Sequence, residues 1–224
     1  MLDPVKPEDS YSAKTHLHQP VPEMATVAAT ALPADAPEAA LPSEVRPEII
    51  TWEKLVEAIS PALAGKKIIA EDLGVVTPQV RRLLEKSGYP GMKLMEFAFD
   101  SDSTNENLPC HFEKNMVVYG GTHDNETLAG FFGPGQSRRM LRFARRYLDV
   151  SQNVQIPWAL IRAGYASCAD TVVFQLQDFL GLDNRARINT PSTLGGNWCW
   201  RLVKGQLSDD LAVKIRDLTE LYGR

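Results

Sequence analysis

The sequence predicts an α/β protein with parallel strands, and three observations support this. From Ile49 onward, short apolar runs of strand length alternate with segments of helical length whose apolar residues recur at helical spacing. Each short run closes on a polar or charged residue, as strands do at the carboxyl edge of a parallel sheet. Glycine and proline mark the boundaries between runs, and no sequence repeat of fixed period accompanies the alternation.

The first elements of this region are a helix and a buried strand. Thr51 is expected to cap the helix, whose apolar residues recur at helical spacing until Pro61 stops it. The continuous apolar run 67–70 then predicts a buried strand that ends at Glu71.

A second helix and a second strand follow. Thr77 is a suitable N-cap, Pro78 suits the first helical position, and Gly88 ends the helix. The apolar run 92–99 predicts a strand with Asp100 at its end.

A polar loop over 101–114 leads to the third predicted strand, 116–119, which runs into the segment 120–124. Two helices are predicted next, over 138–147 and over 157–169, the second with a proline in its first turn. The fourth predicted strand is 171–176, which ends at Gln177 and Asp178.

The polar residues at the strand ends are the candidate functional residues. Barrel enzymes build their active sites from the loops that follow parallel strands. Glu71 and Asp124 follow the first and third predicted strands, so their carboxylates can converge at the same end of the predicted parallel strands. Two carboxylates suit glycosyl transfer, which needs a proton donor and negative charge beside an oxocarbenium ion. The alternative is structural: such carboxylates also cap helices or pair with arginines.

Residues 1–48 differ in composition from the rest of the chain. Residues 1–47 hold eight of the fifteen prolines, no glycine and a single aromatic residue, Tyr11. Such a segment buries too little apolar surface to offset its ordering entropy. We therefore predict a disordered Pro/Ala-rich tail over 1–48 and a folded part over 49–224.

Composition excludes several classes of protein. The 224 residues are 44% hydrophobic with a net charge of −4, which gives no field that attracts nucleic acid or a membrane surface. Three cysteines without CxxC spacing indicate reduced thiols, and no run of about twenty apolar residues is present. No dinucleotide fingerprint, serine elbow or metal-binding histidine pair occurs. We expect no cofactor and no metal.

Four segments together resemble one enzyme family. They are AEDLGVVT over 70–77, GMKLMEFAFD over 91–100, GTHDN over 121–125 and GGNWCWR over 195–201. In order and spacing they are similar to the 4-α-glucanotransferases, the amylomaltase or disproportionating enzymes of glycoside hydrolase family 77. The resemblance implies the C-terminal portion of a (β/α)8 TIM barrel, about its last four β/α units.

The resemblance also implies roles for individual residues. Glu71 would be the general acid/base and Asp124 the transition-state stabiliser, with His123 beside it and Phe97 as an apolar platform on the acceptor side. Further substrate-binding or supporting residues would be Asp72, Gln177, Asp178 and Asn189. For Trp198 and Trp200 we favour packing in the core, with sugar stacking as the alternative.

One part of the family pattern has no counterpart. The resemblance implies an aspartate nucleophile at the end of the fourth barrel strand, and the family motif around it, an Arg one residue or so before an Asp that is followed by His, has no counterpart before Trp52. Asp3, Asp9 and Asp35 lie in the predicted tail. The chain by itself is therefore expected to lack the covalent step. A half-barrel also exposes sheet edges, which favours a complementing N-terminal half or self-association.

The expected function is transfer of α-1,4-glucan segments between maltooligosaccharides by a retaining two-carboxylate mechanism, within maltose, glycogen or starch metabolism. The alternative is a non-catalytic glucan-binding or assembly remnant of the family. The expected location is the cytoplasm, or a plastid if the source is a plant or alga.

Overall fold

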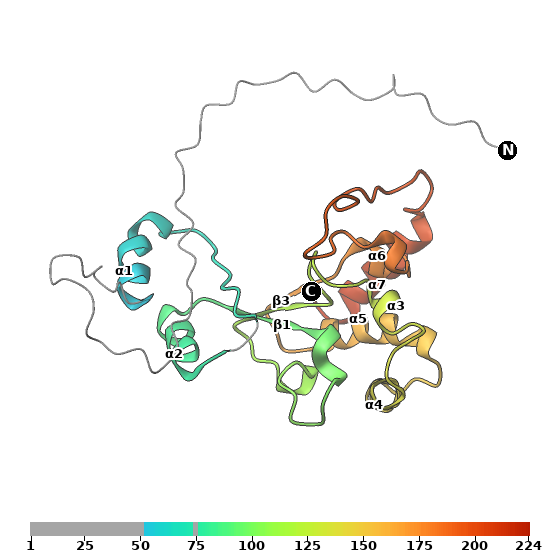
Figure 1. Ribbon diagram of the computed structural model, residues 1–224, viewed down its shortest axis with the longest axis horizontal. Helices are drawn as coiled ribbons and strands as arrows, with labels where there is room; N and C mark the ends of the chain where they lie inside the picture. The colour runs from blue at the N-terminus through green and yellow to red at the C-terminus, as the bar shows by residue number, and fades with distance from the viewer. Residues whose placement is uncertain (1–51, 74–75) are drawn as a thin grey trace, which may run out of the picture. The chain divides into compact units, whose positions relative to one another are not determined.

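The computed structural model describes residues 52–73 and 76–224 (Figure 1). The predicted tail and the predicted cap Thr51 lie outside these residues. The helices and strands are α1 (Trp52–Leu63), α2 (Pro78–Ser87), β1 (Gly91–Leu94), β2 (Met116–Tyr119), α3 (Leu128–Phe131), α4 (Arg138–Leu148), α5 (Ile156–Ala166), β3 (Thr171–Val173), α6 (Leu176–Phe179) and α7 (Asp209–Leu221). Short 3-10 helices are η2 (Met95–Phe99), η3 (Pro109–His111), η4 (Asn153–Gln155) and η5 (Asn184–Ala186).

The three strands form one parallel sheet in the order β1-β2-β3. Gly91 is opposite Met116, and Val117 is opposite Thr171. The helices α3, α4 and α5 lie between β2 and β3 in the chain, as the crossover between parallel neighbours requires. The prediction of a parallel α/β protein is therefore confirmed.

The strand predicted over 67–70 is wrong for the described chain. This segment is irregular, and its backbone contact with the sheet is a single hydrogen bond from Ala70 N–H to the Pro90 carbonyl at 2.9 Å. A strand requires a ladder of such bonds with a neighbour. Ile69 is exposed and not buried, because no neighbouring layer covers this apolar run in the described residues.

Two other strands end earlier than predicted. β1 stops at Leu94 and the chain turns into η2, in which Glu96 N–H donates to the Gly120 carbonyl at 3.0 Å. β3 stops at Val173, and Gln177 and Asp178 belong to the short helix α6. Apolar runs that are buried on both sides look alike in strands and in tight helices, so the sequence did not separate them.

The helix predictions are mostly confirmed. The Thr77 side chain accepts a hydrogen bond from Val80 N–H at 3.3 Å at the start of α2, and Gly88 ends that helix at φ 66°. The helices predicted over 138–147 and 157–169 correspond to α4 and α5. Pro61, however, lies inside α1 and does not stop it. Pro61 supplies no N–H to the helix ladder, and α1 ends two residues after it, at Leu63.

The core lies between the sheet and the helices α4 and α5, and aromatic rings form much of it. Phe99 in η2 is 1% exposed and makes edge-to-face contacts with Phe132, Phe143 and Tyr147, with ring centroids 5.6 to 6.1 Å apart. Such contacts fix the position of η2 against α4. Because η2 directly follows β1, this packing also fixes the carboxyl end of the sheet.

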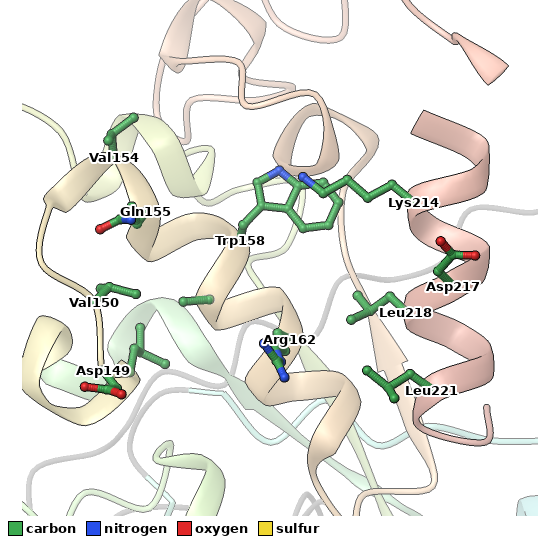
Figure 2. A pocket seen from close by; sticks show the side chains of 12 residues that line it. Asp149, Val150, Val154, Gln155, Trp158, Arg162, Lys214, Asp217, Leu218 and Leu221 are labelled. Carbon is green, nitrogen blue, oxygen red and sulfur yellow. The ribbon is translucent and has the colours of Figure 1, made fainter. Parts of the chain in front are cut away.

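A cavity of about 920 Å³ lies between α5 and α7 (Figure 2). Lys214 of α7 places its Nζ 3.4 Å from the centroid of the Trp158 ring of α5, a cation–π contact. None of the predicted site residues lines this cavity. No helix in the described part of the chain is long and apolar enough to cross a membrane.

Candidate active site

A second cavity, of about 600 Å³, opens across the carboxyl ends of all three strands. The last residue of each strand lines it: Leu94, Tyr119 and Val173. Four of the predicted site residues line the same cavity: Glu71, Phe97, His123 and Asp124. The structure thus brings together side chains that are up to 53 residues apart in the sequence. This is the place where parallel sheets with helical crossovers carry their sites.

Glu71 lies on the irregular segment before α2 and is exposed. Its neighbour Asp72 accepts a hydrogen bond from Met92 N–H at 2.6 Å through Oδ1, which attaches the segment to the start of β1. Asp72 lines a different cavity, of about 410 Å³. Its position is therefore that of a support for the Glu71 segment, and a role at the substrate stays a prediction.

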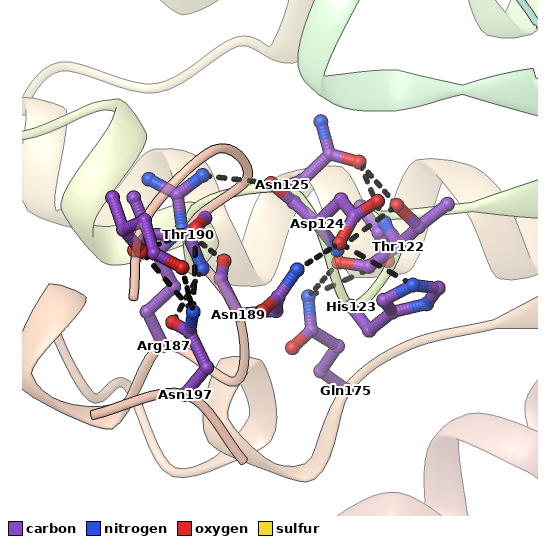
Figure 3. Close-up of polar contacts among 11 residues, drawn as sticks. Thr122, His123, Asp124, Asn125, Gln175, Arg187, Asn189, Thr190 and Asn197 are labelled. Atoms are coloured by element: carbon purple, nitrogen blue, oxygen red, sulfur yellow. Dashed lines mark hydrogen bonds and ion pairs between the residues drawn. The ribbon is translucent and has the colours of Figure 1, made fainter. Parts of the chain in front are cut away.

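The loop that carries His123 and Asp124 is held by its own polar side chains (Figure 3). Thr122 donates to the Asn125 Oδ1 from both its N–H, at 2.9 Å, and its hydroxyl, at 2.7 Å. Gln175, which follows β3, donates from Nε2 to the Thr122 carbonyl at 3.0 Å. These contacts join the loop after β2 to the residues after β3.

Asp124 is held from the segment that follows α6. Asn189 donates from Nδ2 to Asp124 Oδ1 at 2.5 Å, and Arg187 donates from Nη2 to the Asp124 carbonyl at 2.7 Å (Figure 3). His123 Nε2 lies 3.3 Å from the same Oδ1. About half of the Asp124 side chain stays exposed. A carboxylate that is fixed on one side and open on the other can accept hydrogen bonds from a bound hydroxyl.

Gln177 and Asp178 are buried behind the loop and do not line the cavity. Asp178 accepts a hydrogen bond from Leu128 N–H at 2.8 Å at the start of α3, and Gln177 donates to the Ala186 carbonyl at 3.1 Å. Burial raises the pKa of Asp178 to about 6. In this structure both residues support the polypeptide behind the site.

The prediction that Trp198 packs in the core is wrong. Its side chain is 56% exposed, and its ring lies against His123 with centroids 5.1 Å apart. The backbone of Trp198 has φ 62°, which is unfavourable for a residue other than glycine. Hydrogen bonds to Ile188 and from Arg201 hold it there, at 2.7 and 2.8 Å. Trp200 is half-buried and lines a separate cavity.

Sequence reasoning did not single out several residues that shape this site. They are Thr122, Asn125, Gln175 and Arg187. Thr122 and Asn125 could have been found from the sequence because they flank the predicted site residues His123 and Asp124. For Arg187 it was a cation two residues before the predicted Asn189. Gln175 lay inside a predicted strand and gave no signal.

A cavity lined by acidic and aromatic residues at the carboxyl ends of parallel strands lies where α/β proteins, both barrels and open sheets, carry their functional sites. A family model described as 4-alpha-glucanotransferase, glycoside hydrolase family 77, matches residues 41–206. The chain belongs to this family of 4-alpha-glucanotransferases.

Individual relatives agree with the family model. A 4-alpha-glucanotransferase from Clostridium butyricum is 43% identical over 171 residues, and a chloroplastic/amyloplastic one from Arabidopsis thaliana is 40% identical over 194 residues. These matches cover 76% and 83% of this chain, but 35% and 34% of the relatives. The chain thus spans about a third of the length of these curated relatives.

A solved structure shares the fold. Amylomaltase from Streptococcus agalactiae, in complex with acarbose, superposes with a TM-score of 0.72 at 34% identity. The match covers 77% of this chain and 35% of that one. The fold described above is therefore similar to a part of amylomaltase.

Proposed function

We propose that this chain carries the general acid/base and the transition-state stabiliser of a 4-α-glucanotransferase that moves α-1,4-glucan segments between maltooligosaccharides. The observation that carries the proposal is that Glu71, Phe97, His123 and Asp124 line one cavity at the carboxyl ends of the strands. The acarbose in the Streptococcus agalactiae relative supports an α-glucan as the ligand.

In the proposed reaction, Glu71 protonates the glycosidic oxygen as its bond to the anomeric carbon breaks. An aspartate from another part of the enzyme attacks that carbon, and a glucan ester forms. Glu71 then removes the proton from the hydroxyl of the acceptor sugar, which displaces the aspartate and forms the new glycosidic bond. Asp124, fixed by Asn189, binds hydroxyls of the distorted sugar ring and stabilises its positive charge.

Phe97 is proposed as the apolar platform for the acceptor sugar. It lies between Glu71 and Asp124 in the sequence, is 41% exposed, and lines the same cavity. An exposed phenyl ring at a polar cavity offers a face on which the C–H groups of a sugar can pack. Placement of the enzyme in the cytoplasm, or in a plastid, stays a prediction.

A second candidate function is favoured by one observation. No aspartate in the 224 residues is followed by a histidine, as the motif around the family's nucleophile requires. A glucan-binding remnant of the family would need no nucleophile, and its Glu71 and Asp124 would only accept hydrogen bonds from sugar hydroxyls.

A chimeric enzyme distinguishes the two functions. Residues 52–224 of this chain replace the matching segment of the Clostridium butyricum relative, and release of glucose from maltotriose is measured. The catalytic function predicts glucose release by the chimera. A folded chimera that binds acarbose but releases no glucose would support the remnant.

Trp198→Ala is expected to weaken the binding of acarbose to the chimera by about tenfold, which corresponds to about 1.4 kcal/mol. The exposed indole beside His123 is placed to cover the apolar face of a sugar, and its removal leaves that face in water. Titration calorimetry measures the change. Trp158→Ala, in the cavity between α5 and α7, is the matched control. Equal losses in both variants would refute stacking at Trp198.

A further inference from the structure

Arg187 is a half-buried arginine whose guanidinium group bridges two segments of the candidate site (Figure 3). Its Nε donates a hydrogen bond to the Asn189 carbonyl at 2.8 Å, and its Nη2 donates one to the Asp124 carbonyl at 2.7 Å. Nε and Nη2 lie on the same edge of the planar guanidinium, so one rigid group makes both contacts. The Asp124 carbonyl is thereby fixed relative to the Asn189 carbonyl, although the two residues are 65 positions apart in the sequence.

The backbone that carries this guanidinium is itself held in place. Arg187 follows η5, and its N–H donates to the Asn184 carbonyl at 3.1 Å. The preceding residue, Ala186, is 4% exposed, and its carbonyl accepts a hydrogen bond from the buried Gln177 at 3.1 Å. The guanidinium therefore extends from a fixed base toward the loop after β2.

Further hydrogen bonds around this guanidinium reach the side chains of the candidate site. Asn189 donates from its N–H to the His123 carbonyl at 3.1 Å and from Nδ2 to Asp124 Oδ1 at 2.5 Å. Ile188 accepts a hydrogen bond from Trp198 N–H at 2.7 Å through its carbonyl. The segment that carries the guanidinium thus joins the loop after β2 to the exposed indole.

The geometry does not support a direct role for Arg187 at the ligand. The described residues that line the cavity of about 600 Å³ do not include Arg187. Both of its acceptors are backbone carbonyls, and about half of the Asp124 side chain stays exposed. The arginine therefore contacts the polypeptide behind the carboxylate, and the carboxylate remains free to accept hydrogen bonds from a sugar.

We infer that Arg187 is a positioning residue of the glucan-transfer site: its guanidinium holds the Asp124 and Asn189 carbonyls together and so fixes the direction in which the Asp124 carboxylate meets a sugar ring. Lysine cannot replace it, because a single ammonium group lacks the planar pair of donors that reaches two carbonyls side by side. The inference deepens the proposed function, on which the role of Asp124 rests.

The first test measures amide hydrogen exchange by NMR in the full 224-residue chain. Arg187→Met is expected to speed exchange of the Asn189 and Trp198 amides about tenfold, the factor for loss of one hydrogen bond to a charged group. Arg187→Lys keeps the charge and is expected to exchange as fast as Arg187→Met. Arg185→Met is the matched control, because the Arg185 side chain is 91% exposed and pairs with Asp183. It should leave both rates unchanged, and the amides of β2 should keep their rates in all three variants.

The second test measures release of glucose from maltotriose by the chimera described above. Arg187→Met is expected to lower kcat about tenfold and to change KM less than twofold, because Asp124 acts on the distorted ring of the transition state. Arg187→Lys should not restore kcat, and Arg185→Met should keep the rate of the unmodified chimera.

The inference is overturned if Arg187→Met leaves the exchange of Asn189 and Trp198 unchanged, or if Arg187→Lys restores it. Equal acceleration of the β2 amides would also overturn it, since Arg187 would then act on global stability alone. A higher KM with unchanged kcat would show that Arg187 binds the sugar instead. A chimera with native Arg187 that releases no glucose contradicts the proposed function, whereas hydrogen exchange in the 224-residue chain still decides whether Arg187 holds the loop.

Discussion

Replacing Glu71 by glutamine in the chimera is expected to lower the rate of glucose release from maltotriose by about 10²- to 10⁴-fold. Glutamine has nearly the same shape as glutamate but cannot donate a proton to the leaving oxygen or take one from the acceptor. Because Glu71 lies at the edge of the cavity and is exposed, its replacement should leave the fold unchanged. Initial rates over a range of maltotriose concentrations separate kcat from KM, and the loss is expected in kcat.

Glu57→Gln serves as the control for this variant, since Glu57 is an exposed glutamate on α1. It is expected to keep the rate of the unmodified chimera. If Glu71→Gln loses less than about tenfold in kcat, Glu71 does not act as the general acid/base. Another residue would then have to supply the proton transfer that accompanies the role of Asp124.

Phe99→Ala is expected to lower the free energy of unfolding of the chain by about 3–5 kcal/mol. Phe99 is buried among three aromatic rings, and its truncation leaves a cavity that the rigid surroundings cannot fill. Phe97 lies two residues earlier in the same 3-10 helix but is exposed, so Phe97→Ala should cost less than about 1 kcal/mol. Chemical denaturation of both variants measures the difference.

The same pair separates stability from function. In the chimera, Phe97→Ala is expected to raise KM for the acceptor sugar. Phe99→Ala should lower the activity only because it lowers the fraction of the protein that is folded. Equal losses of stability in the two variants would contradict the assignment of Phe99 to the core and Phe97 to the cavity.

Local signals were sufficient to predict some elements of the fold. The start of α2 follows from a capping threonine and a proline in the first turn, and β2 from an uninterrupted apolar run. The end of β1 was not predictable in this way, because residues 95–99 are as apolar as a strand. These residues form the 3-10 helix η2, whose Phe99 packs against Phe143 and Tyr147 of α4, and such contacts between distant segments cannot be predicted from the local sequence pattern.

Sequence reasoning named the exposed residues that line the candidate site and some of the residues that support it, such as Asn189, but not the supports Gln175 and Arg187. Glu71, His123 and Asp124 stand at the ends of predicted strands and within family motifs, so their sequence positions carry the information. Trp198 was assigned to the core because alternating aromatic residues usually pack there, but its side chain is exposed and its ring lies against His123.

The most direct measurement of the central claim compares the purified 224-residue chain and the chimera for release of glucose from maltotriose. We expect release by the chimera and none by the chain alone, because the chain carries Glu71 and Asp124 but no counterpart of the family's nucleophile motif. Circular dichroism of the chain shows that it is folded under the assay conditions. Glucose release by the chain alone that disappears in Glu71→Gln would contradict this claim, and so would a folded chimera that releases none.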